Sequence, residues 1–149
     1  DEGLLLDVAS GGELAVALAT GVPANACTLH GNNKSVTELS EAIAAGVRHV
    51  IVDSFDELDR LDGLWAYGFR HANGGPPQVV LRITPGVSAY THEFIATGQD
   101  DSKFGFNLRN GDAIKAVDRA RRSDSVDLVG VHLSLIHIGR FRRIKRFGH

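Results

Sequence analysis

The stretch Leu4-Leu-Leu-Asp7-Val-Ala-Ser10-Gly-Gly-Glu13 decides the fold of this chain, and later segments repeat its pattern. Its apolar start is typical of a short buried strand, and Ser10 followed three residues later by Glu13 has the spacing of a helix capping box. A strand, a polar corner and a helix start are therefore compressed into one short segment. This order is typical of a βα unit.

The same order recurs twice along the chain. Ser35-Val-Thr-Glu38 follows the apolar run 26–29, and Ser54-Phe-Asp-Glu57 follows the run 48–52. We expect a capped helix to begin at each of these serines. Strands that alternate with capped helices at this spacing predict parallel βαβ units with right-handed crossovers. The predicted fold class is therefore α/β.

The second half of the chain extends the alternation. Apolar runs predict a fourth strand at 78–83 and a fifth at 128–132. The segment 84–107 between them is predicted to be a long connection, and loops of that length in compact domains are usually functional. The helix that follows it is expected to turn Ile114 and Val117 toward the core.

Composition places the chain among ordinary globular proteins. It has 149 residues, of which 43% are apolar and 23% charged. No apolar run approaches the roughly 18–20 residues of a membrane span, so we expect a cytoplasmic protein without a membrane partner. Cys27 is the single cysteine, which excludes a disulfide framework within the chain. Because histidines and carboxylates are too scattered for metal-ligand spacing, we predict no metal site.

The two ends of the sequence predict a fragment with an added tail. The chain contains no methionine, and residues 1–132 hold all 18 acidic residues and 11 basic ones, whereas residues 133–149 hold 5 basic residues. The tail also resembles a translated sequencing adapter. We therefore interpret 133–149 as non-native, and its basic charge does not predict a nucleic-acid partner.

Polar residues stand at or just after the end of each predicted strand. They are Asp7, the segment 30–34, Asp53, Arg82 and His132. Each alone has an ordinary explanation, such as a helix start, an ion pair or a core histidine. Parallel strands end at one edge of a sheet, where α/β proteins bind ligands, so the five together predict a binding site. No nucleophile motif identifies its chemistry.

Five motifs resemble the diaminopimelate decarboxylase family in order and spacing. The similarity runs from about Gly3 to His132. The motifs are Asp-Val-Ala-Ser-Gly-Gly-Glu-Leu (7–14), His-Gly-Asn-Asn-Lys-Ser (30–35), Val-Asp-Ser-Phe-Asp-Glu-Leu (52–58), Leu-Arg-Ile-Thr-Pro-Gly (81–86) and Thr-Gly followed by Ser-Lys-Phe-Gly (97–105).

The resemblance implies an alanine-racemase-type (β/α)8 TIM barrel that binds pyridoxal 5'-phosphate, with residues 1–132 forming part of it. It implies decarboxylation of meso-2,6-diaminopimelate to L-lysine by a homodimer, with an amino acid as the small-molecule substrate. The family's Schiff-base lysine lies on a strand that would precede Asp1. We therefore assign no catalytic residue and expect the fragment itself to be inactive.

Residue roles follow from the same resemblance. Asp7 is expected beside the Schiff-base lysine, Arg82 is expected to line the cofactor pocket, and Lys103 is expected in a salt bridge across the dimer interface. His137 lies three residues too late for the family's ring-stacking histidine, so we give it no role. An ornithine or arginine decarboxylase relative and a non-catalytic homologue that binds a partner protein remain alternatives.

Overall fold

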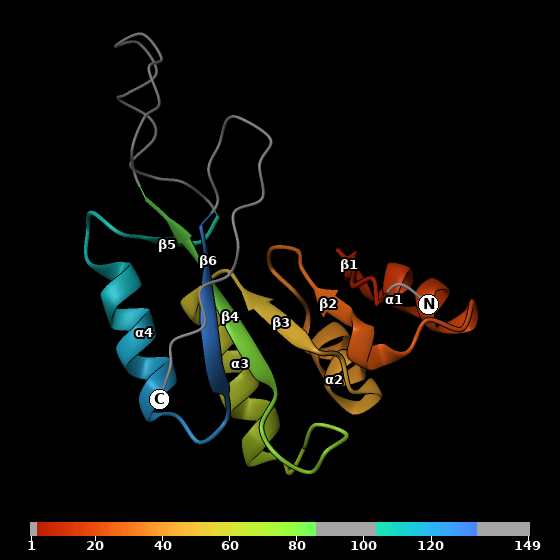
Figure 1. Cartoon of the computed structure of the whole chain (residues 1–149). Helices are drawn as coiled ribbons and strands as arrows, with labels where there is room; N and C mark the ends of the chain where they lie inside the picture. The colour runs from red at the N-terminus through yellow and green to blue at the C-terminus, as the bar shows by residue number, and fades with distance from the viewer. Residues whose placement is uncertain (1–2, 86–103, 134–149) are drawn as a thin grey trace, which may run out of the picture.

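The computed structural model describes residues 3–85 and 104–133, in which strands and helices alternate as predicted (Figure 1). The elements in chain order are β1 (Leu6–Val8), α1 (Gly11–Ala19), a 3₁₀ turn (Ala24–Ala26), β2 (Cys27–Leu29), α2 (Val36–Ala45), β3 (His49–Val52), α3 (Phe55–Ala66), β4 (Gln78–Thr84), β5 (Phe106–Asn107), α4 (Asp112–Arg122) and β6 (Asp127–Leu133).

All of these strands belong to one parallel sheet. β1, β2, β3 and β4 pair in chain order, and β6 pairs with β4 from Gln78↔Asp127 to Ile83↔Leu133. The two-residue strand β5 pairs with the end of β4. The α/β prediction is confirmed. β5 lies inside the predicted long connection 84–107. The sequence did not predict this strand, because two residues are too few to show the alternation of a strand.

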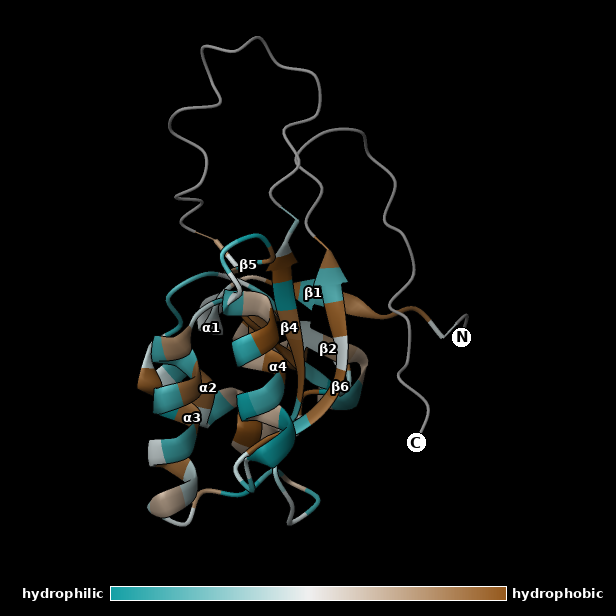
Figure 2. Cartoon of the chain, turned by 90° about the vertical axis from the view of Figure 1, so that its left-hand side faces the viewer, coloured by the Kyte–Doolittle hydropathy of each residue, from teal (hydrophilic) through white to brown (hydrophobic). Residues whose placement is uncertain are grey.

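The helices cover one face of this sheet (Figure 2). Alternate strand residues such as Leu29, Val52 and Leu81 join the buried core with helix residues such as Leu39 and Leu58. Side chains alternate between the two faces of a strand, so the residues between these point to the other face. We call this opposite side the inner face of the sheet.

Two expectations about the core are wrong. Leu4, Leu5 and Leu6 are 82%, 54% and 38% exposed, because β1 starts only at Leu6 and pairs with β2 alone among the described residues. Ile114 is 64% exposed. The side of α4 that meets the sheet is instead a stripe of small buried residues at helical spacing, Ala113, Ala116 and Ala120. Val117 packs against the core as predicted.

The helix starts follow the predicted serines, but only one forms a complete capping box. The Ser35 hydroxyl accepts the Glu38 N–H, and the Glu38 carboxylate accepts the Ser35 N–H. Ser10 and Ser54 cap their helices in the same way, but the reciprocal bond is shifted. In these two helices the glutamate accepts the N–H of the residue before the serine. The Glu13 carboxylate accepts the Ala9 N–H, and the Glu57 carboxylate accepts the Asp53 N–H.

Backbone geometry explains this shift. Ser35 has a φ of −69°, whereas Ser10 and Ser54 have φ values of −152° and −153°. The more extended serines present the N–H of the preceding residue to the carboxylate. Gly21 and Gly46, which stand at the ends of α1 and α2, have φ values of 91° and 87°, the left-handed conformation that is common after helices.

Candidate functional site

The polar residues that follow the strands lie on the inner face. Val8, Leu29, Val52, Leu81 and Val131 belong to the helix-side core or pack against it. Each of these residues has a polar neighbour in the sequence. Because side chains alternate between the two faces of a strand, that neighbour points to the inner face. This places five predicted residues together, which we call the inner-face cluster: Asp7, His30, Asp53, Arg82 and His132.

One part of the inner-face cluster joins strands that are not neighbours in the sheet. Asp7 Oδ1 lies 3.4 Å from His30 Nε2. The His30 ring meets the His132 ring edge-on, with 5.8 Å between the ring centroids. His30 follows β2 and His132 lies on β6, and β3 and β4 separate these strands. The sheet therefore curls around its inner face, as a barrel wall does.

The surroundings of His132 disfavour its cationic form. Burial lowers the pKa of its imidazole, and the positive charges of His30 and Arg82 lower it further. His132 is opposite Arg82 in the β4–β6 register. Its Nδ1 is buried without a hydrogen-bond partner among the described residues. This ring nitrogen therefore has hydrogen-bonding capacity that no described residue uses.

The second part of the inner-face cluster is an ion pair between the ends of β3 and β4. Arg82 Nη1 donates to Asp53 Oδ2 at 3.2 Å, and the two side chains are 28% and 3% exposed. Burial raises the pKa of the Asp53 carboxyl, and the charges of Arg82 and Lys34 offset only part of that rise. Asp53 Oδ1 is buried with no hydrogen-bond partner within 3–85 and 104–133.

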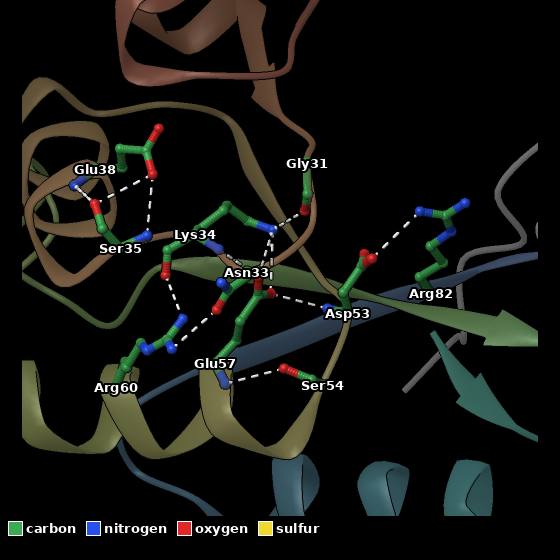
Figure 3. Close-up of polar contacts among 10 residues, drawn as sticks. All are labelled: Gly31, Asn33, Lys34, Ser35, Glu38, Asp53, Ser54, Glu57, Arg60 and Arg82. Carbon is green, nitrogen blue, oxygen red and sulfur yellow. Dashed lines mark hydrogen bonds and ion pairs between the residues drawn. The ribbon is translucent and has the colours of Figure 1, made fainter. Parts of the chain in front are cut away.

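Lys34 does not join the inner-face cluster, contrary to the prediction for the segment 30–34. Figure 3 shows its side chain turned toward Glu57. Its Nζ donates to the Glu57 carboxylate at 3.2 and 3.1 Å and to the Gly31 carbonyl at 2.5 Å. Lys34 and Glu57 are 2% and 0% exposed, so this is a fully buried ion pair.

Glu57 makes contacts near the site that the sequence pattern did not predict. Its position three residues after Ser54 identified it only as a capping residue. In the structure its carboxylate also accepts the backbone N–H groups of Lys34 and Asp53, both at 2.9 Å. A capping motif in the sequence carries no signal for such a contact with a distant loop.

Other predicted site residues lie elsewhere. Lys103, expected at a dimer interface, lies outside the described residues, and so does His137. Lys115 is exposed on α4. The described part of the chain contains no group of three or more histidine, cysteine or acidic residues that could hold a metal ion. It also contains no helix long and apolar enough to cross a membrane.

Comparison with known proteins identifies the family. A profile described as pyridoxal-dependent decarboxylase, pyridoxal binding domain, matches residues 1–141. The diaminopimelate decarboxylases of Mycobacterium tuberculosis (strain H37Rv) and Bacillus subtilis (strain 168) are 49% and 47% identical to the chain over 139 residues, which is 93% of it.

A solved structure supports the same assignment. The diaminopimelate decarboxylase from M. jannaschii, in co-complex with L-lysine, superposes with a TM-score of 0.71 at 36% identity, over 85% of this chain and 28% of that chain. The chain spans 29% and 30% of the length of the two curated relatives. The parallel sheet and its helices are thus part of a TIM-type barrel, and the chain belongs to the pyridoxal-dependent decarboxylases.

Proposed function

We propose that this chain is part of the cofactor-binding barrel of a diaminopimelate decarboxylase. The complete enzyme would release CO2 from meso-2,6-diaminopimelate and yield L-lysine. The curated relatives quoted above carry that activity in their names, and the M. jannaschii structure was determined in co-complex with L-lysine, the expected product. An ornithine or arginine decarboxylase and a non-catalytic homologue are not favoured by these relatives.

The observation that carries the proposal is the inner-face cluster with its buried, uncommitted polar atoms. Pyridoxal 5'-phosphate combines an anionic phosphate with polar groups around an aromatic ring. The Arg82 guanidinium, 28% exposed, offers positive charge, and His132 Nδ1 and Asp53 Oδ1 offer hydrogen-bonding capacity beside it. These residues fit such a cofactor, which when bound supplies the electron sink that decarboxylation needs.

We assign Asp7 and Arg82 to the cofactor side of the barrel. Asp7 is 61% exposed on the inner face, so its carboxylate is accessible to a ligand, and His30 orients it at 3.4 Å. Arg82 keeps a cation at the centre of the inner-face cluster.

The described lysines do not suit covalent attachment of the cofactor. Lys34 is buried and committed to Glu57, and Lys115 is exposed on α4 among the helices that cover the other side of the sheet. The family resemblance implies that the attaching lysine is on a preceding strand of the full barrel. The 149-residue chain alone is expected to be inactive.

The remaining expectations belong to the same proposal. Lys103 would form a salt bridge across the dimer interface of the complete enzyme. Residues 1–132 would be the native barrel part and 133–149 the non-native tail. The enzyme would work in the cytoplasm, without a nucleic-acid or membrane partner.

The complete genomic reading frame tests this proposal. The protein that it encodes should release CO2 and form L-lysine from meso-diaminopimelate when pyridoxal phosphate is supplied. Preferential release of putrescine from ornithine or agmatine from arginine would overturn the substrate assignment. An absorbance band of covalently bound cofactor on the purified 149-residue chain would overturn the assignment of the attaching lysine to a preceding strand.

A further inference from the structure

We propose that Asp53 is a positioning residue that fixes the Arg82 guanidinium on the inner face, and that the buried Lys34–Glu57 pair holds Asp53 for this task. The proposal deepens the proposed function, because it rests on Arg82 facing the cofactor. It concerns a residue for which the sequence predicted no particular role beyond the strand-end set.

The two side chains of the Asp53–Arg82 pair are unequally exposed. Asp53 is 3% exposed and Arg82 is 28% exposed, with 3.2 Å between Oδ2 and Nη1. A buried carboxylate at the end of β3 thus holds a partly exposed guanidinium on β4. Arginine has many rotamers, so an anchor of this kind reduces the ordering that a ligand must impose when it binds.

The Glu57 carboxylate supports the backbone of Asp53. Glu57 accepts the Asp53 N–H at 2.9 Å and the Lys34 ammonium at 3.1 Å. Arg60 Nη1 donates to the Lys34 carbonyl at 2.6 Å, which ties the same loop to α3 (Figure 3). One buried carboxylate therefore connects the loop after β2, the end of β3 and the start of α3. Asp53 cannot move without disturbing these bonds.

Phe104 and Gly105 lie against the Arg82 side chain. The Arg82 Cζ lies 5.5 Å from the centre of the Phe104 ring. Thr84 Oγ1 donates to the Phe104 carbonyl at 2.6 Å, which fastens this segment to β4. A Cβ on Gly105 would lie 2.8 Å from the Arg82 carbonyl oxygen and 3.2 Å from its Cγ. The base of the arginine is therefore confined by backbone, and Asp53 sets the direction of its head group.

In the described part of the chain, only one oxygen of the Asp53 carboxylate is hydrogen-bonded. Its second oxygen, Oδ1, is buried without a hydrogen-bond partner in the described ranges 3–85 and 104–133. A buried ion pair that leaves such an atom unsatisfied is poorly arranged for stability alone. This arrangement is typical of sites where local rules yield to function.

The test compares two matched substitutions in the 149-residue chain. Asp53→Asn removes the charge that faces Arg82, and Asp59→Asn removes a charge that pairs with Arg119 in a more exposed contact between α3 and α4. The readout is the Nε–Hε signal of Arg82 in ¹⁵N-arginine-labelled protein, assigned by its loss in Arg82→Lys. We expect Asp53→Asn to speed hydrogen exchange at this position at least about tenfold, as expected when a side chain loses its anchor. Asp59→Asn should leave the signal unchanged.

The wild-type chain itself provides a second measurement if Asp53→Asn fails to fold. An Arg82 signal with the exchange rate of free arginine in the wild-type chain would overturn the proposal. An unchanged Arg82 signal in a folded Asp53→Asn variant would overturn it equally. Both measurements are independent of cofactor and of activity.

Cofactor affinity separates this proposal from the proposed function. In the enzyme from the complete reading frame, Asp53→Asn should raise the Kd for pyridoxal phosphate at least about tenfold, the effect of a misplaced binding group. If that enzyme binds no pyridoxal phosphate but Asp53→Asn still releases Arg82, the proposed function fails and the positioning role stands. If it binds the cofactor and Asp53→Asn changes neither Kd nor the Arg82 signal, the positioning role fails and the proposed function stands.

Discussion

The Nζ of Lys34 lies 3.1 Å from Oε2 of Glu57, and neither side chain is more than 2% exposed. Removing one partner of a fully buried ion pair leaves an uncompensated charge, so Glu57→Gln should lower the free energy of unfolding by about 3–5 kcal/mol. Urea unfolding measures this loss. Asp59→Asn, which breaks a more exposed pair, should cost less than about 1 kcal/mol. Equal losses in the two variants would contradict the importance of the buried pair.

Gly31 tests the close contact between the loop after β2 and β1. A Cβ at Gly31, where φ is 101°, would lie 2.6 Å from the Ala9 carbonyl oxygen, whereas a Cβ at Gly21, where φ is 91°, meets nothing within 4 Å. Gly21→Ala should cost about 1–2 kcal/mol from left-handed strain. Gly31→Ala should cost about 1–3 kcal/mol more, because it adds overpacking. Thermal unfolding of both variants checks the difference.

The capping box of α2 should make stability depend on pH. The N–H groups of Ser35 and Gly11 lower the pKa of Glu38 below its ordinary value of 4.5. The folded state therefore favours the carboxylate, and this stabilisation is present above pH 4.5 and is lost as the pH falls through the lower folded pKa. The difference in Tm between wild type and Glu38→Gln should shrink from pH 7 to pH 3. Ser35→Ala should cost about 1 kcal/mol at pH 7.

His132 should titrate below its ordinary pKa of 6.5, because burial and the charges of His30 and Arg82 disfavour its cationic form. Stability linked to this group is therefore present above pH 6.5 and decreases as the pH falls, since the unfolded chain takes up the proton first. NMR titration of the ring protons measures the midpoint. Arg82→Gln should raise it, because this substitution removes one of the charges that lower the pKa of His132.

Much of the fold could be predicted from the sequence because local signals agree with the tertiary structure. The serines Ser10, Ser35 and Ser54 mark helix starts through bonds within one helical turn. The five main strands follow from apolar runs bounded by turns. β5 and the exposure of Ile114 were missed because they depend on pairing and helix phase, which the short segments do not encode locally.

The sequence predicted which residues form the inner-face cluster, but it did not predict every contact around them. The rule that strands present polar ends at one edge correctly grouped Asp7, His30, Asp53, Arg82 and His132. It failed for Lys34, because a lysine at a corner can turn outward to a ligand or inward to an acid elsewhere in the chain. The acid is Glu57, twenty-three residues later, and its choice depends on packing of the loop against α3.

The order of strands in the sheet has a consequence for synthesis on the ribosome. Each of β2, β3 and β4 pairs with the strand made just before it, so the sheet can grow as the chain emerges. Arg82 meets its cross-strand neighbour His132 only when β6 has been made. A nascent chain that stops before Asp127 could have β1 to β4 paired, but Arg82 would still lack its neighbouring strand β6.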